Sequence, residues 1–163
     1  MSRAVPGGAD VPTPVSPSTA ADDAGGNRGH RVGAHTADCV VEAWAPDRVS
    51  CLAEAGAALV GVCADVAGVP ATGAVPVSIG PAADDELLVA LLEETIFVMD
   101  GLGAVPVRFV LSGTDEGGVT GTIETAPAGA VTRTGPVPKG VSYHGLRMQH
   151  RGGVWRCLAI VDV

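Results

Sequence analysis

The chain has 163 residues, which is the size of one ordinary domain. Its 18 acidic and 10 basic residues give a formal net charge of −8, whereas a general binder of the phosphate backbone would be basic. The longest apolar run, at 55–64, is too short to span a membrane, and the first residues lack the apolar segment of a secretory signal. The composition therefore predicts one soluble, cytoplasmic domain.

Residues 1–33 differ in composition from the rest of the chain. They are rich in Pro, Gly and Ala, and they contain no aromatic residue, Leu or Ile. Such a segment cannot bury enough apolar surface to offset the entropy lost on ordering. We expect a disordered tail at 1–33 and a folded domain at 34–163.

Hydrophobic spacing predicts the elements of the domain in chain order. Asp47 is placed to cap a first helix, whose apolar residues recur near the 3.6-residue period. Pro76 confines a short strand to a sheet edge. After the second helix the period changes to two, which is typical of strands. The predicted helices are 48–63 and 85–99, and the predicted strands are 37–44, 75–79, 105–111, 119–125, 141–148 and 154–163.

The order β-α-β-α-β-β-β-β indicates an α+β domain with two helices packed on a largely antiparallel sheet. Charge is uneven along it: residues 34–130 carry a net charge of −12, and residues 131–163 carry +4. This asymmetry favours a protein-docking surface or an approach to an anionic group. The cysteines form no C-x-x-C pair, so we expect small buried thiols without disulfides.

Three places in the sequence are candidates for chemistry. His35 and Asp38 stand at the entry of the first predicted strand, and Lys139 precedes a strand that carries Tyr143 and His144. Along that strand, Lys139 and Tyr143 are expected on one face and His144 on the other. Asp162 follows an apolar strand, where a charge is unexpected. Each position also has an ordinary structural interpretation, as a cap, a sheet residue or a solvated terminus.

Carboxylates at Asp38 and Asp162, together with an oxygen of Val163, would suit a hard divalent cation such as Ca²⁺ or Mg²⁺.

Several segments, taken in their order along the chain, resemble the archease family over about 35–163. They are HTAD at 35–38, ELLVALLEETIFVMD at 86–100, VPVRF at 105–109, PKGVSYHGLRM at 138–148 and WRCLAIVDV at 155–163.

The resemblance implies a small α+β protein that acts as a cofactor of an RtcB-type RNA ligase in tRNA splicing or RNA repair. Such a protein promotes guanylylation of the ligase and allows multiple turnovers, without itself being an enzyme. The resemblance also implies a divalent metal site, which falls on Asp38, Asp162 and Val163, and a functional lysine, which falls on Lys139.

Ca²⁺ is the expected ion of this site. Any association with RNA is expected to be indirect, through the ligase. Gly140 departs from the family, which commonly has Ala there.

Two other functions remain open from the residues. One is a chaperone-like module that modulates other RNA- or DNA-modifying enzymes through the acidic surface. The other is a metal-dependent hydrolase that uses Asp38, Asp162 and His144, although the sequence offers few ligands and no clear general base. We therefore take His35, Lys139, Tyr143 and His144 as partner-binding residues and assign no catalytic residue.

Overall fold

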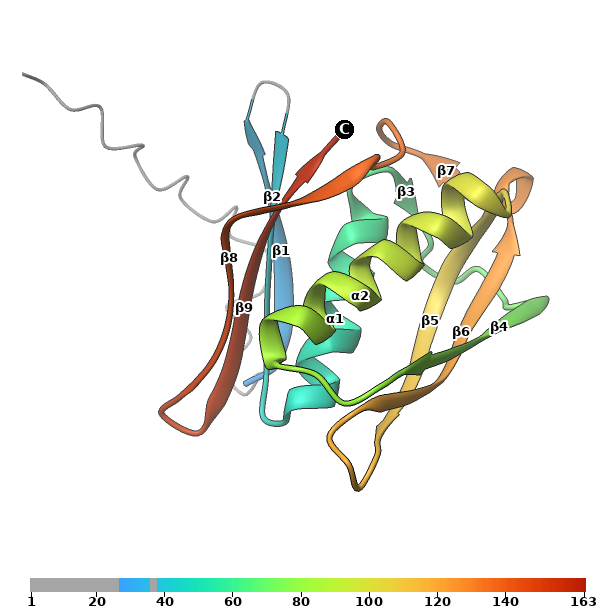
Figure 1. Cartoon of the computed structure of the whole chain (residues 1–163). Helices are drawn as coiled ribbons and strands as arrows, with labels where there is room; N and C mark the ends of the chain where they lie inside the picture. Colours follow the sequence, from blue (N-terminus) through green and yellow to red (C-terminus); the bar gives the residue numbers. More distant parts are fainter. Residues whose placement is uncertain (1–26, 36–37) are drawn as a thin grey trace, which may run out of the picture.

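Two helices lie between two antiparallel sheets (Figure 1). The structure is a computed structural model that describes residues 27–35 and 38–163. The helices are α1 (Arg48–Gly61) and α2 (Asp84–Ile96), and α2 continues into a short π-helix, η1 (Phe97–Gly101). No helix within these described ranges is both long and apolar enough to cross a membrane.

The larger sheet has four strands in the order β1-β2-β9-β8, and the smaller has three in the order β4-β6-β5. A short pair, β3 and β7, and one 3-10 turn, η2 (Ala128–Ala130), complete the described chain. The strands are β1 (Gly29–His35), β2 (Asp38–Ala45), β3 (Ala64–Asp65), β4 (Gly73–Ile79), β5 (Ala104–Gly113), β6 (Val119–Pro127), β7 (Thr132–Arg133), β8 (Gly140–Arg151) and β9 (Val154–Asp162).

The predicted α+β class with two helices and antiparallel sheets is confirmed, and so is the edge position of the strand with Pro76. The arrangement of the layers is different from the prediction. The helices are covered by a sheet on each side, so each buries more than one narrow stripe (Figure 1). The other face of the four-stranded sheet is left uncovered (Figure 1).

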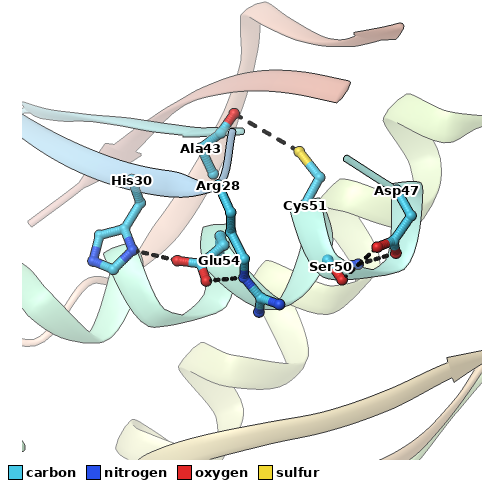
Figure 2. Close-up of polar contacts among 7 residues, drawn as sticks. All are labelled: Arg28, His30, Ala43, Asp47, Ser50, Cys51 and Glu54. Carbon is cyan, nitrogen blue, oxygen red and sulfur yellow. Dashed lines mark hydrogen bonds and ion pairs between the residues drawn. The ribbon is translucent and has the colours of Figure 1, made fainter. Parts of the chain in front are cut away.

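The first helix begins where the sequence predicts. The Asp47 carboxylate accepts hydrogen bonds from the Ser50 backbone N–H at 2.8 Å and from the Ser50 hydroxyl at 2.7 Å, and these bonds lower the pKa of Asp47 (Figure 2). Further along, Gly56 leaves room for the Phe109 ring, because a Cβ at this position would lie 2.6 Å from a ring carbon. The absence of a side chain at Gly56 therefore allows α1 to pack closely on β5.

Strand β1 corrects the predicted domain boundary. It begins at Gly29, inside the segment that was expected to be a disordered tail, whereas residues 1–26 lie outside the described part of the chain. The strand is held to α1 by Glu54, which accepts from His30 Nδ1 at 2.7 Å and pairs with Arg28 (Figure 2). These two contacts lower the pKa of Glu54 against the opposing effect of burial. The composition of 1–33 did not reveal β1, because the anchor that holds the strand lies in the helix.

Strand β8 is irregular in its middle. Its register against β9 shifts between Ser142 and Arg147, and Gly145 has a φ of +69°. Just past this bulge the Met148 backbone N–H donates to Asp85 of α2 at 2.7 Å. Asp85, in the first turn of α2, thus links the helix to the bulged strand.

All four cysteines are free thiols, and Cys51, Cys63 and Cys157 are buried, as expected from the sequence. Contact with the Cys51 thiol and burial raise the pKa of Cys157 well above its ordinary value. The cysteines therefore belong to the apolar core, which also draws on Val, Leu and Ala from both sheets and both helices.

Candidate functional site

The candidate residues meet at one end of the four-stranded sheet. In the strand register His35 of β1 pairs with Asp38 of β2, Asp38 pairs with Asp162 of β9, and Asp162 pairs with Gly140 of β8. One row thus crosses all four strands, although its members are far apart in the sequence. The end of β9 lies beside the start of β2 at this edge, as Figure 1 shows.

Asp38 and Asp162 are directly opposite each other in an antiparallel ladder, so their side chains leave the same face of the sheet. That face is the uncovered one, because the adjacent Val161 is fully buried on the other side. Asp162 is exposed and Asp38 is half-buried. Two like charges directly opposite each other destabilise a sheet, and among the described residues neither carboxylate has an ion-pair partner.

Lys139 is fixed next to this pair through its backbone. Its N–H donates to the carbonyl oxygen of Asp162 at 2.8 Å, and the preceding Pro138 is buried. The Lys139 side chain is exposed, and no carboxylate of the described residues lies within ion-pair distance of it. The positively charged Lys139 side chain therefore lies at the rim of the carboxylate row, where an incoming anionic group can reach it.

Gly140 forms the floor beside Asp162. A Cβ built on Gly140 would lie 4.0 Å from Asp162 Oδ2, which is an ordinary van der Waals contact. An alanine at this position would therefore fit without moving the carboxylate. The departure at Gly140 leaves the geometry of the row intact.

Tyr143 and His144 are less closely associated with this row. Both are exposed, and both fall in the part of β8 that has no residue-to-residue partner on β9. The expectation that Lys139 and Tyr143 share one face and His144 takes the other stays a prediction, because Tyr143 and His144 lie within the register shift between Ser142 and Arg147. Within this bulge the His144 N–H donates to the Ser142 hydroxyl at 3.2 Å.

The donors fit a hard cation only in part. Asp38 and Asp162 offer carboxylate oxygens, and Val163 follows directly with a main-chain oxygen. Within the described part of the chain no group of three His, Cys, Asp or Glu side chains is placed to hold a metal. The side chain of His35, with Thr36 and Ala37, lies outside the described residues. Because Ca²⁺ takes six to eight oxygens, such a site would be open to water or to a group from a partner.

The protein is thus a small α+β domain whose candidate residues, two carboxylates and a lysine, lie at the edge of an uncovered sheet face. The sequence model of the archease protein family matches residues 30–163. Two curated Mycobacterium tuberculosis sequences, from strains CDC 1551 and H37Rv, are each named "Probable protein archease". Each is 39% identical to this chain over 139 residues, which cover 85% of this chain and 77% of the relative. The chain belongs to the archease family.

Solved structures agree with this fold. A solution structure of Methanobacterium thermoautotrophicum protein 1598 matches with a TM-score of 0.67 and 24% identity, over 83% of this chain and 99% of that one. A crystal structure described as an archease and possible chaperone, from Thermotoga maritima, matches with a TM-score of 0.58 and 17% identity, over 79% and 93%. The family match begins at residue 30, which agrees with a domain that starts at β1.

Proposed function

We propose that this protein activates an RtcB-type RNA ligase in tRNA splicing or RNA repair in the cytoplasm, and that it is not itself a catalyst. The observation that carries the proposal is the row in which Asp38 faces Asp162 and Lys139 is bonded to the Asp162 backbone. These are the positions at which the archease resemblance implies functional residues. Membership of the archease family supports the choice of partner.

Asp38 and Asp162 hold a divalent cation in this proposal, with Ca²⁺ as the first choice and Mg²⁺ as the second. Their carboxylates supply hard oxygen ligands from two neighbouring strands, and the main-chain oxygen of Val163 completes the protein's share. The bound ion offsets the repulsion between the two carboxylates and adds positive charge at the sheet edge. The remaining coordination positions face outward, where a ligand from the ligase can reach them.

Lys139 positions an anionic group of the ligase next to the cation. Its exposed ammonium carries three donors, and its backbone bond to Asp162 keeps it at a fixed place on the rim. Tyr143 and His144 extend the same docking surface along β8. His35, at the β1 end of the row, marks its opposite limit.

The test is guanylylation of a purified RtcB-type ligase by GTP, with and without this protein. The native chain should accelerate guanylylation and allow repeated ligation, whereas Asp38→Ala and Asp162→Ala should abolish both effects. Asp115→Ala is a matched control, since Asp115 is exposed in the turn after β5. Equal stimulation by the native chain and by Asp38→Ala and Asp162→Ala would refute the cation role, and no stimulation by the native chain would refute the function.

The second candidate is a chaperone-like module for other RNA- or DNA-modifying enzymes. The description of the Thermotoga maritima structure as a possible chaperone supports this second candidate function. Affinity capture from the source cells separates the two: recovery of the RNA ligase supports the first function. Recovery of other modifying enzymes without the ligase supports the second, particularly if Asp38→Ala leaves that recovery unchanged.

A further inference from the structure

A pocket of about 240 Å³ opens on the same uncovered sheet face, at the end opposite the carboxylate row. Its walls come from all four strands. In the register Arg31 pairs with Glu42, Glu42 with Leu158, and Leu158 with Arg147. The next row runs from Gly29 through Trp44 and Arg156 to Gln149, and Arg151 stands beyond it on β8.

Four arginines thus converge on one pocket of a protein whose net charge is −8. Only Arg31 has an acidic partner, Glu42, which is the single carboxylate among the lining residues. Arg147, Arg151 and Arg156 form no ion pair with any described residue. Like charges gathered on one sheet face repel, so the cluster reduces stability unless an anion occupies it.

The pocket also contains an aromatic surface. The Trp44 indole covers the Cα of Gly29, since a Cβ there would lie 2.7 Å from a ring carbon. The Arg31 guanidinium carbon lies 5.9 Å from the centre of the same ring, within cation–π range. Trp44 is half-buried, and Gln149 adds a side-chain amide nearby.

We propose that this pocket binds one nucleotide unit of single-stranded RNA, with the phosphate held by Arg147, Arg151 and Arg156 and the base stacked on Trp44. Positive groups that follow a backbone, combined with an aromatic side chain for a base, are how proteins hold single strands. Guanidinium groups also match phosphate oxygens in geometry. The choice of RNA among anions rests on the proposed function, to which it adds direct contact with the RNA.

The size and surroundings of the pocket favour a short contact. Its volume is below the roughly 300–1,000 Å³ of pockets that enclose a drug-sized ligand, so it fits one unit of a strand that continues elsewhere. The acidic remainder of the domain repels a long polyanion. An acidic protein segment would satisfy the arginines but would bring no aromatic group to the Trp44 indole.

The experiment is fluorescence anisotropy of a labelled short oligouridylate with the purified full chain, at low salt and without ligase. Arg147→Gln and Arg156→Gln should each weaken binding about tenfold, because each removes a charge-assisted contact. Arg133→Gln is the matched control: it makes the same charge change at an exposed site on β7, outside the pocket, and should leave affinity within about twofold. Equal losses in all three variants would mean unspecific attraction and would overturn the site.

Tryptophan emission gives an independent measurement. The chain has two tryptophans, and Trp155 lies against His150, with ring centres 5.1 Å apart. In Trp155→Phe the emission comes from Trp44 alone, and oligouridylate should quench it. Lack of quenching, or competition by an oligoglutamate peptide as strong as that by RNA, would overturn the assignment to RNA. Because no ligase is present, either failure is separate from a failure of the guanylylation test.

Discussion

The two ends of the uncovered face of the four-stranded sheet are built on the same ladder but carry opposite charge. At one end Asp38 and Asp162 are opposed, and about 20 Å away along β9, at ~3.3 Å per residue, Arg156 stands among three other arginines. Each end concentrates one sign of charge with little internal compensation. In the two proposals above, the same face binds a cation at one end and an anion at the other.

Loss of the proposed cation site at Asp38 and Asp162 should change a measured quantity more than any other substitution described below. The double variant Asp38→Asn/Asp162→Asn should lose more than about 100-fold in Ca²⁺ affinity, since changes in residues that only support a ligand already cost up to that much. Calorimetric titration measures it. The control is Asp100→Asn/Asp115→Asn, which removes two charges at exposed positions and should bind as the native chain does. Native-like Ca²⁺ affinity in Asp38→Asn/Asp162→Asn would contradict the proposal that these two carboxylates bind the ion.

Strand β1 serves both ends, because it carries His35 and Arg31. Glu54→Ala should destabilise the protein by about 1–2 kcal/mol, since it removes hydrogen bonds to His30 and Arg28 at a half-buried carboxylate. Urea unfolding measures this change. Hydrogen exchange should speed up first in β1, and uniform acceleration over the whole domain would contradict the anchoring role.

The same carboxylate predicts a pH dependence. Because the folded state lowers the pKa of Glu54, its contribution is complete above the unfolded value of about 4.5 and is lost as the pH falls through the folded pKa. Glu54→Gln should flatten this acidic part of the stability profile and leave the neutral part parallel. If the free energy of unfolding of Glu54→Gln falls with decreasing pH as steeply as that of the native chain, other carboxylates are responsible for the pH dependence.

Two glycines provide a matched pair, one at each end. Gly29→Ala places a methyl 2.7 Å from the Trp44 ring and should cost about 1–3 kcal/mol while shifting tryptophan emission. Gly140→Ala meets only an ordinary contact with Asp162, so its effect should stay within about 0.5 kcal/mol. Thermal unfolding of both variants measures the loss of stability at each end of the sheet. Equal losses would contradict the statement that Gly29 is more tightly packed than Gly140.

One substitution in the carboxylate row should stabilise the protein slightly. Asp38→Asn alone should stabilise the metal-free protein by about 0.2–1 kcal/mol, because it removes like-charge repulsion across the strands. The gain should shrink as salt increases. Urea titrations in chelator at low and high salt check both statements, and a loss of stability in chelator would indicate that the carboxylates are already compensated.

Much of the fold could be predicted from local pattern. The Asp47 cap, the leucine-rich second helix and the alternating strands were all found, because each depends on spacing within one segment. Strand β1 was missed because its anchor is Glu54. The bulge in β8 was missed although Gly145, an isolated glycine inside a strand pattern, marks it in the sequence. The basic character of 131–163 was visible, but Arg31 and Trp44 could not be joined to it without the strand order.

The α+β class, the two helices, the family resemblance and the candidates Asp38, Lys139 and Asp162 could all be found in the amino-acid sequence. The pairing of Asp38 with Asp162, the enclosure of the helices by two sheets and the pocket shared by four arginines became visible only in the folded protein. The two groups of features differ in the sequence range of the interactions that produce them. Helix caps and hydrophobic periods act over a few residues, whereas pairing of β2 with β9 joins segments separated by most of the domain, and only the folded sheet sets that register.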